Sequence, residues 1–171
     1  MPAAPAIPAR SVILGTLVLL TAQASGDVIT VSDIRLDGFQ PVPPTGSLAT
    51  GLASMTIDTD TRDITISGVF SGLEGPITMA HLHGPADIGQ SSPLIFTFLT
   101  IETDDGFSGS FSAEDRVSSF QLNALLDSRT YLNVHTGAHP DGEIRGQVGV
   151  PAPGSAALLA CLALGAAHRR R

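Results

Sequence analysis

The chain has 171 residues, with 18 glycines, 12 prolines and only 5% aromatic residues. Short runs of Ser, Thr, Val and Ile between Gly and Pro favour many short strands over long helices, in one domain of ordinary size. All 16 acidic residues lie between Asp27 and Glu143, where five arginines leave a charge of 5 minus 16, or -11. This acidity disfavours nucleic-acid binding and favours cations or basic partners, unless it serves only solubility.

Residues 1–24 are predicted to be a signal peptide. Arg10 precedes the apolar run SVILGTLVLL, and an Ala-Gln-Ala pattern ends at Ala24. An apolar run of about ten residues is too short to span a bilayer, so we expect cleavage after Ala24 and an exported protein. The single cysteine, Cys161, excludes a disulfide within the chain.

Residues 150–171 combine a Pro-Gly motif at 151–154, an apolar stretch and a terminal His-Arg-Arg-Arg. This arrangement resembles the PEP-CTERM sorting signals, although Ala152 stands where those signals have glutamate. The resemblance implies processing by an exosortase-type enzyme. The apolar stretch is shorter than the roughly 20 residues of a free-standing transmembrane helix, so we expect a transient membrane anchor and a cell-surface or extracellular location.

The region between these segments, residues 25–149, is predicted to be one domain. Alternating apolar residues and turn residues predict strands at 27–36, 47–57, 63–70, 77–83, 94–101, 106–111, 130–135 and 143–148. Apolar residues recur at near-helical spacing only in 118–126, which predicts one short helix there.

Two stretches of this region carry a family resemblance. The first is a His-x-His-Gly strand at 81–84, and the second joins an Asn-Val-His-Thr run at 133–136 to a Gly-Glu-Ile-Arg-Gly-Gln run at 142–147. Both resemble the chordin-type (CHRD) domain, and the resemblance implies an extracellular β-sandwich. The motif residues of the late stretch, apart from its histidine, are Asn133, Thr136, Gly142, Glu143, Arg145 and Gly146. We therefore predict an all-β fold, a Greek-key β-sandwich of immunoglobulin-like or superoxide-dismutase-like type, with one short helix near 118–126.

Three histidines are the candidate metal ligands. Alternate residues of a strand share a face, so His81 and His83 lie on one side of their strand, and His135 lies on the polar side of the later strand. We expect these imidazoles outside the core, where neighbouring strands would bring them together around copper or zinc. The alternative is that they hydrogen-bond to loop backbone and hold the turn from Gly84 to Gln90.

A second resemblance is to the copper-zinc superoxide dismutases, which place a His-x-His strand and a late histidine on the outside of a β-barrel. Arg145 corresponds to the arginine that follows a Gly-rich turn in that family, whereas the bridging histidine has no counterpart after Gly84. Asp87, Asp141 and Glu143 are candidates for hydrogen bonds to the histidines.

The leading functional interpretation is a non-catalytic binding or structural module of the cell surface, with an extracellular protein or a polysaccharide matrix as its partner. The sequence contains neither a G-x-S-x-G elbow nor a phosphate-binding glycine loop. The alternative interpretation is a copper- or zinc-binding domain with a superoxide-dismutase-like histidine site.

Overall fold

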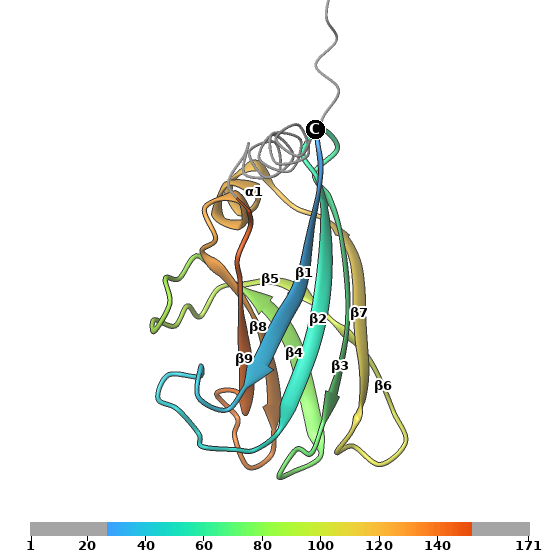
Figure 1. The fold of residues 1–171 in the computed structure, drawn as a ribbon, viewed down its shortest axis with the longest axis vertical. Helices are drawn as coiled ribbons and strands as arrows, with labels where there is room; N and C mark the ends of the chain where they lie inside the picture. The colour runs from blue at the N-terminus through green and yellow to red at the C-terminus, as the bar shows by residue number, and fades with distance from the viewer. Residues whose placement is uncertain (1–26, 152–171) are drawn as a thin grey trace, which may run out of the picture.

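The computed structural model describes residues 27–151, which form one antiparallel sheet of nine strands and one short helix (Figure 1). The elements are β1 (Val28–Asp37), β2 (Thr50–Asp58), β3 (Asp63–Ser71), β4 (Ile77–His83), β5 (Ile95–Phe98), β6 (Thr100–Thr103), β7 (Gly109–Arg116), α1 (Ser119–Leu126), β8 (Thr130–Thr136) and β9 (Ile144–Val148). The spatial order is β5-β4-β8-β9-β1-β2-β3-β7-β6. The prediction of an all-β fold with one short helix is confirmed.

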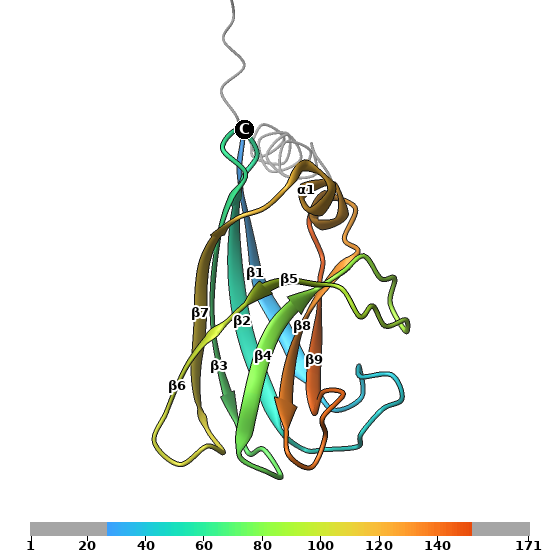
Figure 2. The ribbon, with the colours of Figure 1, turned by 180° about the vertical axis from the view of Figure 1, so that it is seen from behind.

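The sheet nearly closes on itself because one short stretch of chain supplies both ends of this order. Only Leu99 separates β5, which pairs with β4, from β6, which pairs with β7. The backbone N–H of Leu99 donates to Ala80 O of β4 over 3.0 Å, and Thr97 Oγ1 donates to Asp115 Oδ2 of β7 over 3.0 Å. The stretch therefore crosses from one edge of the sheet to the other (Figure 2).

The closure gives the molecule two layers. In Figure 1, β1 and β2 lie in front of β4 and β8, and Figure 2 shows the same layers from behind. Strand β3 shows how the sequence produces this packing, since Ile64 and Ile66 are buried while Thr65 and Ser67 between them are exposed. Alternate apolar residues of both layers thus fill the core between them.

Two predicted strand boundaries are wrong. The segment 94–101 was expected to be one strand, but it divides at Leu99. The strand expected at 106–111 begins at Gly109 and runs on to Arg116, because residues 104–108 form the hairpin turn that precedes it. In that turn, Asp105 Oδ1 accepts hydrogen bonds from the backbone N–H groups of Phe107 and Ser108 at 2.8 and 3.0 Å.

Long loops flank the layer that contains β4 and β8. The β1–β2 connection, 38–49, and the β4–β5 connection, 84–94, project from the same side of the molecule (Figure 1). A third connection, 137–143, joins β8 to β9. Residues from all three connections line a pocket beside β8, which positions the site described below.

The predicted signal peptide at 1–24 and nearly all of the predicted sorting segment at 150–171 lie outside the described residues. Along the described chain, no helix combines the length and apolar character that a membrane crossing requires.

Candidate metal centre

Neighbouring strands bring the three predicted histidines together. β4 pairs with β8 in antiparallel register, with His81 opposite Asn133 and Met79 opposite His135. Since side chains alternate along each strand, Ala80, Leu82, Leu132 and Val134 enter the core. His81, His83 and His135 therefore share the opposite face of the sheet, as the period-two argument predicted.

The histidines lie outside the apolar core but are not exposed. The exposed fractions are 3% for His81 and 7% for both His83 and His135. Every residue of β8 is buried, because this strand has β4 and β9 on its two sides and loops over its outer face. The prediction of an outward-facing histidine cluster is thus corrected to a buried one beneath the loops.

The ligand atoms of the three imidazoles lie within 4.8 Å of one another. His81 Nδ1 and His135 Nε2 are 3.2 Å apart and form a hydrogen bond with each other. Two nitrogens bound to one tetrahedral ion at about 2.0–2.1 Å are separated by about 3.3 Å, so this spacing suits two ligands of one metal. The donor set, three neutral nitrogens, is one that zinc and copper accept.

One hydrogen bond fixes the orientation of the His135 ring. Its Nδ1 lies 2.8 Å from the backbone oxygen of Pro140 in the β8–β9 loop, and a carbonyl can only accept. Nδ1 therefore carries the proton, which leaves the lone pair of Nε2 directed at the cluster. Metal-binding histidines commonly donate their second ring N–H to a backbone carbonyl in this manner.

The remaining ring nitrogens are largely without partners. His81 Nε2 and both ring nitrogens of His83 are buried and form no hydrogen bond with the described residues. The Ser92 backbone lies beside the His83 ring but outside hydrogen-bonding geometry. The alternative prediction, that these histidines hold the Gly84–Gln90 turn through hydrogen bonds, is therefore wrong for His81 and His83. His135 does bond to loop backbone, but in the β8–β9 loop.

Burial keeps the three imidazoles neutral. Desolvation lowers the pKa of all three, and for His83, which is also repelled by the other two rings, the pKa falls to about 4. Neutral imidazole is the form that binds a metal, because the ring must offer a lone pair. The cluster is therefore held in its ligand form at neutral pH.

A pocket of about 360 Å³ opens onto the cluster. His83 and His135 line it together with Tyr131, Asn133 and Arg145 of β8 and β9, and its rim comes from the loops. An ion held by three histidines would keep a coordination position open toward this pocket. The arrangement can thus present a bound metal to a small ligand from solution.

Arg145 also lines the pocket and is only 2% exposed. Its guanidinium lies 3.7 Å from the centre of the Tyr131 ring, which stacks at 5.2 Å on His83. Tyr131 lies on β8 between these two neighbours, and its hydroxyl donates to Ser92 O at 3.1 Å. Alternation along the strand places Tyr131 on the polar side with Asn133 and His135, but the sequence alone assigned it no role at the site.

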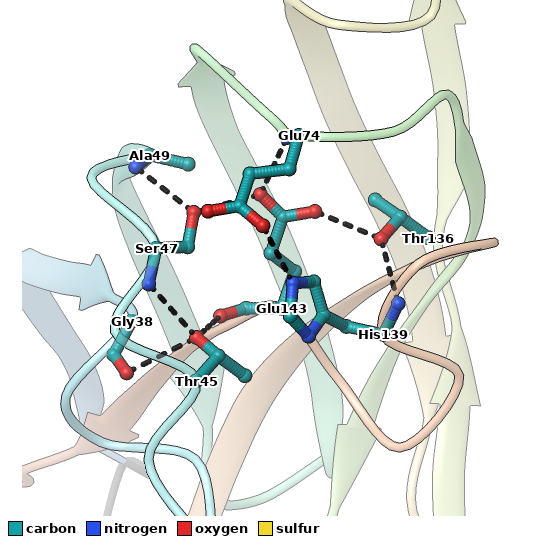
Figure 3. Close-up of polar contacts among 8 residues, drawn as sticks. All are labelled: Gly38, Thr45, Ser47, Ala49, Glu74, Thr136, His139 and Glu143. Atoms are coloured by element: carbon teal, nitrogen blue, oxygen red, sulfur yellow. Dashed lines mark hydrogen bonds and ion pairs between the residues drawn. The ribbon is translucent and has the colours of Figure 1, made fainter.

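Glu143 forms no hydrogen bond with His81, His83 or His135, contrary to the prediction that it supports them. It is fully buried and accepts hydrogen bonds of 2.8 Å from Ser47 Oγ, the Glu74 backbone N–H and Thr136 Oγ1 (Figure 3). Thr45 Oγ1 also donates to its backbone oxygen at 2.9 Å. Glu143 and Thr136 therefore join three segments of the chain, which accounts for their place in the late motif.

The other motif residues shape the backbone around the site. Asn133 Nδ2 donates to Asp141 O at 3.0 Å, while Gly142 has a φ of 120° and a Cβ there would collide with the Asn133 side chain. At Gly146 a Cβ would lie 2.7 Å from Arg35 O of β1, so glycine permits the close approach of β9.

The two other predicted carboxylates differ in position. Asp87 lies away from the cluster and pairs with Arg129 at 3.0 Å. Asp141 lines the pocket, and its charge opposes the lowering of the His135 pKa.

The fold and the buried histidines define an all-β domain with a candidate metal centre, and comparison with known proteins gives its family. The CHRD domain model matches residues 33–148, so the chain belongs to the CHRD domain family. It is 31% identical to chordin of Danio rerio over 123 residues, which cover 69% of this chain and 13% of chordin. The chain thus spans a small fraction of that relative. No solved structure matches it.

Proposed function

We propose that this CHRD domain is a non-catalytic binding module whose centre is a zinc or copper ion held by His81, His83 and His135. The observation that carries the proposal is three buried imidazoles that converge within 4.8 Å and retain ring nitrogens without partners. An unsatisfied buried polar group costs about 1–3 kcal/mol, so three of them are a large penalty in a fold of marginal stability. A metal ion would give these nitrogens their partner.

A metal titration of the purified chain tests this proposal. We expect one Co²⁺ or Zn²⁺ per chain, and Co²⁺ is expected to give the visible absorption of a nitrogen-ligated ion. His135→Gln should weaken binding at least tenfold, because it removes a ligand whose orientation the Pro140 carbonyl fixes.

His139→Gln is the matched control. His139 is the fourth histidine of the described chain, and it pairs with Glu74 at 2.9 Å outside the cluster. Its replacement should leave the metal affinity unchanged. Equal binding by wild type, His135→Gln and a variant lacking all three cluster histidines would contradict the proposal, as would a folded wild-type chain that binds no metal.

We also propose that the domain acts at the cell surface or outside the cell, with an extracellular protein or a polysaccharide matrix as partner. The support is the sequence pattern of 1–24 and 150–171, which suits export followed by exosortase-type processing. Mass spectrometry of the protein from its producing cells should find Ser25 as the first residue, in the surface or medium fraction. An intact Met1 terminus on protein retained inside the cell would contradict export.

A further inference from the structure

Arg145 is a buried cation without an acidic partner among residues 27–151. The ion pairs in this part of the chain join Arg116 to Asp63, Arg129 to Asp87 and His139 to Glu74. Arg145 instead donates to two neutral acceptors, Gln90 O at 2.6 Å and Gln147 Oε1 at 2.8 Å. A guanidinium has five N–H groups, so these contacts leave most of its donors unused.

This unpaired charge faces the same pocket as the histidines. Arg145, His83, His135 and Asn133 all line it. Asp141 also lines the pocket but forms no ion pair with Arg145 within 4 Å. The pocket thus contains a candidate metal site and a buried cation, and the cation has fewer hydrogen-bond acceptors than N–H donors.

The chemistry of the site favours a particular class of ligand. A buried charge is stable only when it is paired and hydrogen-bonded, and a planar guanidinium matches a carboxylate in shape. A divalent ion with three neutral imidazole ligands keeps its full positive charge and an open coordination position. Both positive groups are therefore complemented by one anion, and a volume of about 360 Å³ suits a small molecule.

We propose that this pocket binds a small carboxylate, which ligates the metal held by the three histidines and pairs with Arg145. The proposal rests on the proposed metal centre and adds the chemical class of its external ligand. Tyr131 contacts both sides of this site, since its ring stacks on His83 and lies beneath the Arg145 guanidinium.

Acetate binding to the Co²⁺-loaded protein tests the proposal, at constant ionic strength set with perchlorate. Acetate is expected to change the visible cobalt spectrum in a saturable manner, whereas acetamide, which has the same shape without the charge, should be at least tenfold weaker. Equal effects of acetate and acetamide, or a spectrum that acetate leaves unchanged, would overturn the proposal without need of any variant.

Substitution of the arginine gives a second, independent readout. Arg145→Gln should weaken the acetate effect at least tenfold, and Arg145→Lys, which keeps the charge, should restore part of it. Arg129→Gln, which removes an exposed arginine paired with Asp87, is the matched control and should behave as wild type. Unchanged acetate affinity in a folded Arg145→Gln protein would overturn the role of this residue.

The two proposals fail in distinguishable ways. If the wild-type chain binds no cobalt, the metal centre itself is refuted. If it binds cobalt in proportion to the chain and acetate has no effect, the metal centre stands and only the carboxylate site is refuted.

Discussion

Glu143 is a fully buried carboxylate without a cationic partner among residues 27–151, and its charge is satisfied by hydrogen bonds alone. Its three donors come from the β1–β2 loop, the β3–β4 connection and the end of β8 (Figure 3). Hydrogen bonds to a charged group contribute about 1.5–3 kcal/mol each, more than those between neutral groups. This single side chain therefore holds three segments of the chain together.

Glu143→Ala is expected to destabilise the domain by about 3–5 kcal/mol, because it removes the acceptor of two buried hydroxyl groups and of the partly buried Glu74 N–H. Glu143→Gln should cost less, since the amide oxygen keeps two donors and Thr136 can reverse its hydroxyl. Urea denaturation measures both values. Glu114→Ala, at an exposed position of β7, is the control and should lie within about 0.5 kcal/mol of wild type. Equal stabilities of the Glu143 and Glu114 variants would contradict this account.

The convergence of the three candidate ligands could be predicted from the sequence, whereas the surroundings of the cluster could not. The convergence of His81, His83 and His135 follows from period-two alternation once the two strands are neighbours. Burial by loops and the stacking of Arg145 on Tyr131 depend on where long connections fold back, and no periodicity encodes that. For the same reason the sequence placed Glu143 beside the histidines, whereas its partners come from connections that fold back onto it.

At the level of elements, strands with clear alternation were located well. The segment 77–83 matches β4 at both ends, and the helix begins one residue after Ser118, whose side chain caps it in a capping box with Gln121. The short edge strands were the exception. β5 and β6 run almost without interruption in sequence, and only their tertiary pairings, β5 with β4 and β6 with β7, show that they are separate strands.

The pairing of β4 with β8 is the element-level condition for the whole site. These strands are separated by 46 residues of chain, from His83 to Thr130, and sequence alone does not show that they are neighbours. The register brings Asn133 opposite His81 and Tyr131 opposite His83. A shift of one residue would turn every histidine of one strand into the core, so the apolar residues of both strands fix the geometry of the cluster.

For the whole molecule, the neutral histidines predict a loss of stability in mild acid. The pKa of His83 falls to about 4 in the fold, and the pKa values of His81 and His135 are also lowered from 6.5. Well above pH 6.5 these groups are neutral in both the folded and the unfolded protein. As the pH falls below 6.5, the unfolded chain binds protons before the folded one, which lowers the free energy of unfolding. The metal-free protein should therefore lose about 2 kcal/mol or more between pH 7.5 and 5.

Urea denaturation of the chelator-treated protein at several pH values checks this prediction. The exposed carboxylates with lowered pKa, such as Asp63 beside Arg116, affect stability only at lower pH, so they do not obscure this range. His83→Gln should flatten the dependence, and His139→Gln should keep it. A stability that is constant from pH 7.5 to 5 would contradict burial of neutral imidazoles.

The crossing of residues 95–103 from one end of the sheet to the other has a consequence for how this domain can meet a partner. An open sheet offers a free row of backbone groups to which an extended peptide, or another copy, can add a strand. Here the two outermost strands, β5 and β6, are consecutive pieces of one stretch. β5 also contacts β7, and β6 contacts β4, so the two ends of the sheet lie close together. Residues 27–151 therefore offer little free sheet edge to which a peptide or a second copy could add a strand, so strand exchange between copies is disfavoured.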